Sequence, residues 1–132
     1  RHGIDALAGV GENVLCKLSG LAMPLHSMAA DVLAPWVEYA IEAFGVDRCL
    51  FASNFPVDGL CASFPTIFDG FDAITQGFGP AERRALFRDN ALRVYRLCCD
   101  ALARELQTTP SPQTEALRAE ILSETKPPPN TP

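Results

Sequence analysis

The chain has 132 residues, 48% of them hydrophobic, and a formal net charge of −5 from 16 acidic and 11 basic residues. This length and composition are typical of one globular domain. The basic residues form no patch interleaved with aromatic residues, which argues against nucleic acid as a partner, and no apolar stretch is long enough to span a membrane. The five cysteines lack paired metal-type spacing, and some lie in apolar runs, so we expect a reducing, cytoplasmic environment.

The first elements along the chain are predicted from apolar spacing. Residues 3–9 have the pattern of the last turns of a helix, and residues 13–20 alternate in the manner of a strand. A helix is predicted over residues 32–44, with Asp31 as its N-cap and Pro35 in its first turn. Its apolar stripe comprises Leu33, Trp36, Val37, Ala40, Ile41 and Phe44.

A second buried strand follows over residues 48–52. Two strands joined through a helix are typical of a right-handed parallel crossover, which predicts an α/β fold. Two parallel strands do not cover their own edges and normally lie in larger sheets with both faces covered. Because the chain also begins with Arg1, we expect it to be a piece of a longer protein.

The second half of the chain predicts helices followed by a tail. Ser63 is the expected N-cap of a helix that continues to about residue 76. A short helix over residues 80–88 and a last amphipathic helix come next. Residues 105–132 are polar and rich in Pro, which predicts a disordered tail apart from a marginal helix over residues 115–122. The folded part is therefore expected over residues 1–104.

The most informative segment is the end of the second strand. Its apolar run ends abruptly in Ser53 and Asn54, which Phe55 and Pro56 follow at once. In sheets and barrels of parallel strands, chemistry is done at the carboxyl ends of the strands. The sequence therefore predicts part of a functional site at Asn54.

Three segments resemble, in order and spacing, the closing third of amidohydrolase-related proteins. They are residues 13–21 (NVLCKLSGL), 44–58 (FGVDRCLFASNFPVD) and 89–97 (DNALRVYRL). The most similar branch includes sugar-lactone and pyrone-dicarboxylate lactone hydrolases. The resemblance extends over about residues 3–97, and it is specific for the family but not for the substrate.

This resemblance implies a (β/α)8 TIM barrel, of which residues 1–104 form the C-terminal part: the last two parallel strands and their flanking helices. The family's active site lies at the carboxyl mouth of the barrel. Its first strand supplies a His-x-His pair, later strands another His, and the eighth strand an Asp. None of those histidines lies in this chain, and the Asp position aligns with Asn54. Some members bind a divalent metal there and lactonase-like members work without one, so we expect no metal ligands in this chain and allow for a metal in the full-length protein.

Asn54 is the candidate catalytic residue, as a group that orients water or substrate, because an amide takes no proton at neutral pH and is a weak metal ligand. The alternative is a strand-end amide that satisfies loop backbone. Lys17, Ser19 and Asp58 are the candidate substrate-binding residues. Lys17 would bind an anionic group or form a structural ion pair. Ser19 would lie near the mouth, where its hydroxyl would bind substrate or bond to the next loop. Asp58 would be a displaced carboxylate or a turn cap. His26 lacks a second ligand at metal-type spacing and is interpreted as an exposed loop histidine.

The resemblance implies a hydrolase with a small-molecule substrate. In the full-length protein the expected reaction is the water-mediated ring opening of a lactone or of a related ester or amide. The chain alone is expected to be inactive, because the groups that polarise the carbonyl lie outside it. The alternative is a non-catalytic barrel remnant that acts as a binding or interaction module. The sequence carries no signal for the oligomeric state.

Overall fold

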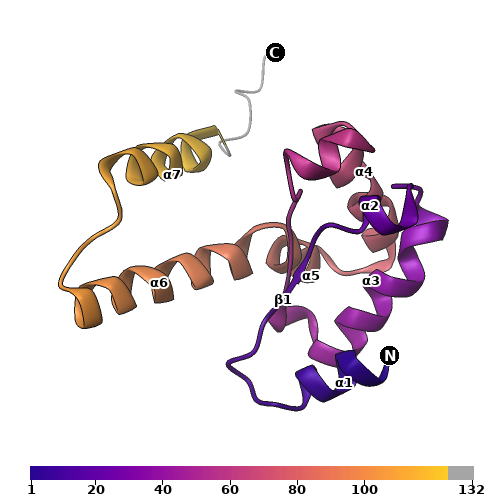
Figure 1. Ribbon diagram of the computed structural model, residues 1–132, viewed down its shortest axis with the longest axis horizontal. Coiled ribbons are helices and arrows are strands. Elements are labelled where there is room, and N and C mark those ends of the chain that lie inside the picture. The colour runs from indigo at the N-terminus through magenta and orange to yellow at the C-terminus, as the bar shows by residue number, and fades with distance from the viewer. Residues whose placement is uncertain (125–132) are drawn as a thin grey trace. The chain divides into compact units, whose positions relative to one another are not determined.

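The computed structural model describes residues 1–124 and divides the chain into two compact units, Arg1–Arg93 and a second that begins at Val94. The first unit holds a small sheet and most of the helices (Figure 1). All residues that the sequence singles out for the site lie in this first unit. Among residues 1–124, no helix combines the length and the apolar character needed to cross a membrane.

The sheet consists of two strands, β1 (Cys16–Leu18) and β2 (Cys49–Phe51), which run parallel. The amide of Ala52 donates to the carbonyl of Leu18 at 3.1 Å and extends the pairing past the end of β2. The structure confirms the two parallel strands joined through a helix that the sequence predicts, although both strands are shorter than the predicted segments.

Helices cover one face of this sheet. On that face the ring of Phe51 stacks on Phe71 of α4 (Phe64–Ile74), with ring centroids 4.3 Å apart, and meets the ring of Phe87 edge-on at 4.8 Å. Side chains alternate along a strand, and Lys17 is exposed on the other face. The sheet therefore has a packed face and a face that is open to solvent at Lys17.

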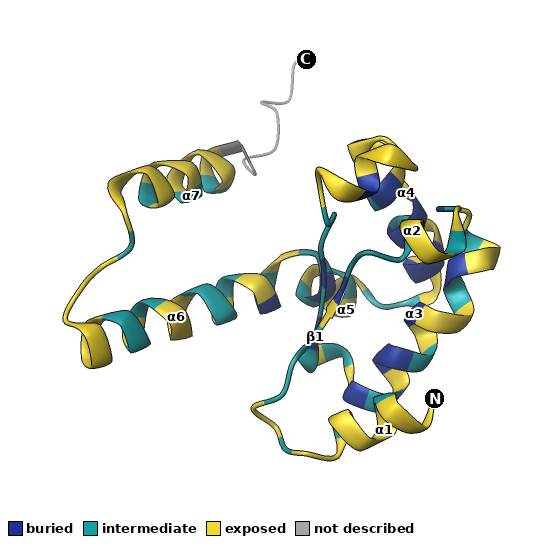
Figure 2. Cartoon of the chain, viewed as in Figure 1, coloured by how far each residue is buried: buried dark blue, intermediate teal, exposed yellow. Residues whose placement is uncertain are grey.

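The helix α3 (Ala30–Phe44) connects the two strands and packs on both of them and on α4. Its buried residues, dark blue in Figure 2, form one stripe that confirms most of the prediction: Leu33, Val37, Ala40, Ile41 and Phe44. The placement of Trp36 in this stripe is wrong, since its side chain is 53% exposed. At about 100° per residue, Trp36 falls on the edge of the stripe rather than within it.

The predicted start of this helix is also wrong. α3 begins one residue before Asp31, and its N-cap is Ala29, which makes no side-chain cap. The amide of Ala29 instead donates to Oγ of Ser27 at 3.0 Å, so the turn that precedes the helix is closed by a serine upstream. Pro35 consequently lies in the second turn rather than the first. There its missing N–H removes one bond of the helical ladder.

Short elements complete the first unit. Ser63 is the N-cap of α4, as predicted, and its Oγ accepts a hydrogen bond from the amide of Thr66 at 3.3 Å. The helix α1 packs on α3, and α2 packs on η2. The bounds of the short elements are α1 His2–Ala8, α2 Ala22–Leu25, η1 Val46–Arg48, η2 Val57–Leu60 and η3 Thr75–Gly77.

A π-helical segment joins two helices that the sequence predicts as separate. α5 (Pro80–Arg84) continues through the π-helical segment η4 (Ala85–Asp89) into α6 (Asn90–Leu106). Asn90 is 5% exposed, and its Nδ2 donates to the carbonyl of Val46 at 2.8 Å and to that of Cys49 at 2.7 Å. These two bonds attach the start of α6 to the segment that leads into β2.

The described part of the second unit contains the rest of α6 and the helix α7 (Pro112–Glu124). Tyr95 donates a hydrogen bond to the carboxylate of Glu115, which lowers the pKa of Glu115 and raises that of Tyr95. α7 includes the marginal helix predicted over residues 115–122 and extends beyond it at both ends, because its contact with α6 is not visible in the composition of the segment alone. The predicted disorder of the rest of the tail stays a prediction. Residues 125–132 of that tail lie outside the described residues, and the predicted domain boundary at residue 104 stays a prediction.

Candidate active site

The carboxyl end of β2 is a tight turn that carries Asn54. Oγ of Ser53 accepts a hydrogen bond from the amide of Phe55 at 3.1 Å, and Asn54 has a left-handed backbone with φ of 53°. Asn adopts this conformation more readily than most residues, because its short amide bonds to nearby groups. Asn54 is half-buried in this position.

Asn54 forms a pair with Asp58, the residue that the sequence offers as a displaced carboxylate. Asp58 lies on η2, is 1% exposed, and accepts a hydrogen bond from Nδ2 of Asn54 to its Oδ1 at 3.0 Å. Its own amide donates to the carbonyl of Asn54 at 3.2 Å. The contact with Asp58 fixes which way the Asn54 amide faces, and it leaves Oδ1 of Asn54 as the acceptor for another group.

The end of β1 approaches the same amide at Gly20. This glycine has φ of 75°, and a Cβ placed on it would lie 3.3 Å from Nδ2 of Asn54. A side chain there would be strained by the backbone and would press on the Asn54–Asp58 pair. The structure therefore brings the ends of both strands together at Asn54, beside the half-buried Ser19. Sequence reasoning used Gly20 only to end the strand and missed this close approach.

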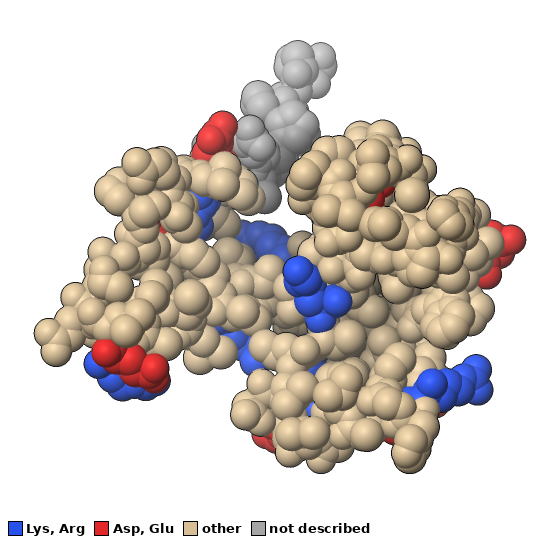
Figure 3. All heavy atoms as spheres, viewed as in Figure 1, with Lys and Arg blue, Asp and Glu red and all other residues tan. Residues whose placement is uncertain are grey.

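Lys17 lies farther from this turn, two residues before Ser19 in the sequence. It sits in the middle of β1, opposite Leu50 in the register, and its side chain is exposed. Among the described residues no salt bridge includes Lys17 or Asp58. The charged side chains on the face drawn in Figure 3 stand in small separate groups. The structural ion pair considered for Lys17 therefore has no partner within the described residues, and its ammonium group is available to an anion.

The two histidines stay outside this arrangement. His26 is exposed and forms the C-cap of α2 with φ of 49°, as the interpretation of an exposed histidine requires. His2 begins α1. No group of three or more His, Cys, Asp or Glu side chains within residues 1–124 is placed to hold a metal ion.

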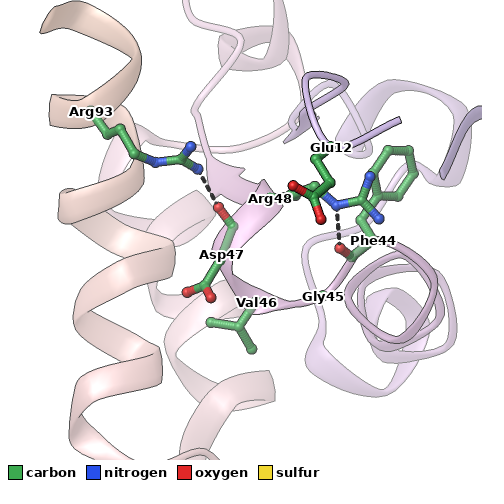
Figure 4. Close-up of a pocket in the computed structure, with 7 residues that line it drawn as sticks. All are labelled: Glu12, Phe44, Gly45, Val46, Asp47, Arg48 and Arg93. Carbon is green, nitrogen blue, oxygen red and sulfur yellow. Dashed lines mark hydrogen bonds between the residues drawn. The ribbon is translucent and has the colours of Figure 1, made fainter. Parts of the chain in front are cut away.

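A pocket of about 400 Å³ lies at the opposite end of β2, where the strand begins (Figure 4). Arg48 is held there by three backbone carbonyls, and Arg93 donates to the carbonyl of Asp47. The three acceptors of Arg48 are Ala8 at 3.1 Å, Gly11 at 2.9 Å and Phe44 at 2.8 Å. Both arginines bind backbone carbonyls, so the residues around this pocket hold separate segments of the chain together. It is not the site predicted at the carboxyl ends of the strands.

Comparisons with known proteins identify the family to which this chain is related. The family model described as amidohydrolase matches residues 5–97, which include both strands and the Asn54 turn. The chain belongs to the amidohydrolase family. A second family model, the bacterial transcriptional activator domain, matches residues 81–122, a region confined to the helices from α5 to α7.

Two sequence relatives agree with this membership. The chain is 53% identical over 85 residues to the uncharacterized protein y4mH of Sinorhizobium fredii, a match that covers 64% of this chain and 29% of that protein. It is 33% identical over 99 residues to an L-fucono-1,5-lactonase of Burkholderia multivorans, which covers 70% of this chain and 33% of the lactonase. The chain thus spans about a third of the length of these relatives.

The solved structures agree as well. A crystal structure of an amidohydrolase from Burkholderia multivorans with bound zinc superposes with a TM-score of 0.63 at 29% identity. The match covers 70% of this chain and 34% of that one, and a second crystal form of the same description, with bound HEPES, gives the same values. Membership of the amidohydrolase family, with a lactonase among the relatives, supports a hydrolase in general terms.

Proposed function

We propose that this chain supplies the last two strand–helix units of a (β/α)8 barrel that opens a lactone, or a related ester or amide, by attack of water. The parallel pair β1–β2, joined through α3, has the topology of two neighbouring barrel strands. The chain covers about a third of each relative, which supports the proposal that the other strands and the activity belong to a longer protein. A small-molecule substrate follows from the same reaction class.

The observation that carries this proposal is the Asn54–Asp58 pair at the carboxyl end of β2. Nδ2 of Asn54 is committed to Asp58, so its Oδ1 is the atom that accepts a hydrogen bond from a water or from a substrate hydroxyl. The amide orients that water without taking its proton. The oxygen of the water attacks the carbonyl carbon, the ring C–O bond breaks, and the ring oxygen gains a proton. The group that first accepts the water's proton lies in the rest of the longer protein.

Lys17 and Ser19 follow as substrate-binding residues. The exposed ammonium group of Lys17 has no acidic partner among the described residues, so it would attract an anionic group of the substrate. Ser19 lies directly before Gly20, where the end of β1 meets Asn54, and its hydroxyl would bond to a polar substrate group there. Asp58 acts on the substrate through Asn54, by fixing the orientation of its amide.

The described residues do not fit a metal site by themselves. The zinc in the crystallised relative makes a divalent metal an option for the family, but Asn54 offers only an amide oxygen and the Oδ1 of Asp58 is already bonded to Asn54. Any metal in the longer protein would therefore take its main ligands from outside residues 1–124. None of the roles given above for this chain's residues passes through a metal.

The test is a chimera in which residues 5–97 replace the matching segment of the Burkholderia multivorans lactonase. The chain alone should show no turnover above buffer on a panel of lactones, whereas the folded chimera should hydrolyse the lactone of its parent. Asn54→Ala in the chimera should lower kcat about 10²-fold, the scale for removing one oriented polar group from a reaction centre. A folded chimera in which Asn54→Ala leaves kcat unchanged would contradict the role of Asn54.

A second candidate function is a non-catalytic barrel remnant that serves as a binding or interaction module. The amide at the position of the family's carboxylate favours it, and so does the match of residues 81–122 to a transcriptional activator domain. The variant Asn54→Asp separates the two functions in the same chimera. If only the Asp variant turns over the lactone, the natural amide impairs catalysis and the module is the better description.

A further inference from the structure

The two strands place a pair of cysteines directly side by side. Cys16 of β1 and Cys49 of β2 are register partners in the parallel sheet. Register partners on neighbouring parallel strands point to the same face, and the strands of a sheet lie about 4.8 Å apart. A disulfide needs Cα atoms separated by roughly 4.4–6.8 Å, so this pair has a spacing that a disulfide can span.

The surroundings of the two sulfur atoms differ. Cys49 has no exposed surface, and its Sγ donates to the carbonyl of Ala40 on α3 at 3.7 Å. Cys16 is half-buried and packs on the edge of the same core. Contact with Cys16 and burial raise the pKa of Cys49, and contact with Cys49 lowers the pKa of Cys16. Cys16 is also the more exposed of the two residues, so its sulfur is the one that a peroxide reaches first.

The other three cysteines have no such partner in the sheet. Cys61 follows η2 and is exposed, and Cys98 and Cys99 lie on α6 in the second unit. Neighbouring residues such as Cys98 and Cys99 do not easily reach disulfide geometry with each other. The register pair of the sheet is thus the place in the described chain where two thiols are held at bonding distance by backbone pairing.

We propose that Cys16 and Cys49 form a reversible disulfide across β1 and β2 when the protein meets a hydroperoxide. The Cys16 thiolate attacks one peroxide oxygen and the O–O bond breaks, which leaves Cys16 as a sulfenic acid and releases an alcohol or water. The sulfur of Cys49 then attacks the Cys16 sulfur, the S–O bond breaks, and water leaves with the Cys49 proton. Two thiols are oxidised and one peroxide bond is reduced, and a dithiol reverses the change.

The disulfide would tie the two strands at their amino ends. It would close a loop that contains α2 and α3, and cross-links of this kind stabilise mainly by restricting the unfolded chain. Asn54 lies beyond the other end of β2, so the bond would leave the candidate active site in place. The expected result is a more stable first unit whose strands no longer separate.

The experiment uses the full chain with Cys61, Cys98 and Cys99 replaced by Ser, so that Cys16 and Cys49 are the remaining thiols. Hydrogen peroxide should remove both free thiols, lower the intact mass by two hydrogen atoms without dimer formation, and raise the Tm by about 10 °C. Dithiothreitol should restore the starting mass and Tm. In the same background, Cys49→Ala should leave a sulfenic acid on Cys16 that dimedone traps, and Cys16→Ala should leave Cys49 unmodified.

Three results would overturn the proposal. One is a folded protein that gains oxygen atoms without losing the two hydrogens, and another is a disulfide that forms only between two chains. The third is a disulfide that forms equally fast in urea, because the strands would then contribute nothing to the pairing. Peptide mapping of the unsubstituted chain after the same treatment checks independently that the bridge joins Cys16 to Cys49.

Discussion

The two ends of β2 use polar side chains in different ways. Where the strand begins, Arg48 and Asn90 give their hydrogen bonds to backbone carbonyls, most of which lie far from them in the sequence. Where it ends, Asn54 bonds to another side chain, Asp58, and retains an oxygen atom for a further partner. The first arrangement holds the fold together, and the second fixes the orientation of the amide at the candidate site. The partner of each polar side chain, backbone or another side chain, therefore distinguishes the two ends of this strand.

The largest effect on stability is expected at the beginning of the strand, for Asn90→Ala. Two carbonyls that now share the buried amide would lose their donor, so the free energy of unfolding should fall by about 2–3 kcal/mol. Urea denaturation followed by circular dichroism measures this change. The control is Asn13→Ala at an exposed position, expected within about 0.5 kcal/mol of the unsubstituted chain. Equal stabilities for the two variants would show that Asn90 has no structural role.

Arg48→Met should lower the free energy of unfolding by about 2 kcal/mol. The substitution keeps an apolar stem but removes the donors to Ala8, Gly11 and Phe44. The matched control is Arg84→Met, because the salt bridge of Arg84 to Asp89 has side chains 65% and 41% exposed and should contribute less than about 0.5 kcal/mol. The same denaturation experiment compares them. A loss at Arg84 as large as that at Arg48 would mean that charge, rather than backbone bonding, is responsible.

At the other end of the strand, Asp58→Ala should lower the free energy of unfolding by about 1–2 kcal/mol. The substitution removes the acceptor of the Asn54 amide and leaves a small cavity at a buried position. Asp58→Asn keeps an acceptor oxygen and should cost less than about 1 kcal/mol. In the lactonase chimera, Asp58→Ala should also lower kcat, because the orientation of the Asn54 amide depends on the acceptor at position 58, whereas Asp58→Asn should keep most of the activity. An Ala variant with the kcat of the unsubstituted chimera would argue that Asp58 only caps the turn.

The smallest effect is expected from the backbone of Asn54. Asn54→Ala and Asn54→Gly lose the same hydrogen bond, but Gly adopts the φ of 53° without strain. The Gly variant should therefore be more stable than the Ala variant by about 1 kcal/mol, while both should be equally inactive in the chimera. A more stable Ala variant would indicate that the turn relaxes to another conformation once the amide is gone.

The sequence predicts those features that depend on neighbouring residues. The stripe of α3, the cap at Ser63 and the abrupt polar end of β2 follow from local spacing, and the structure contains all three. The family membership also came from local segments, and the comparisons confirm it.

The features that the sequence missed depend on contacts between distant segments. Arg48 bonds to Ala8 and Gly11, about forty residues earlier, and no local pattern indicates such a partner. Trp36 has the helical spacing of a core residue, but it lies at the edge of the stripe, where no other element covers it fully. At the candidate site, the alignment of Asn54 with a carboxylate was visible, whereas its bond to Asp58 and its approach to Gly20 needed the folded turn. The roles of Asn54, Lys17, Ser19 and Asp58 remain predictions.

The π-helical segment η4 has a consequence for how this chain can vary. Its five residues, Ala85–Asp89, lie between two α-helical stretches and set the helical position of Asn90, which follows them directly. Loss or gain of one residue in η4 would rotate Asn90 by about 100° around the helix axis. Asn90 would then face away from the carbonyls of Val46 and Cys49. Substitutions in this segment should therefore be tolerated more readily than insertions or deletions.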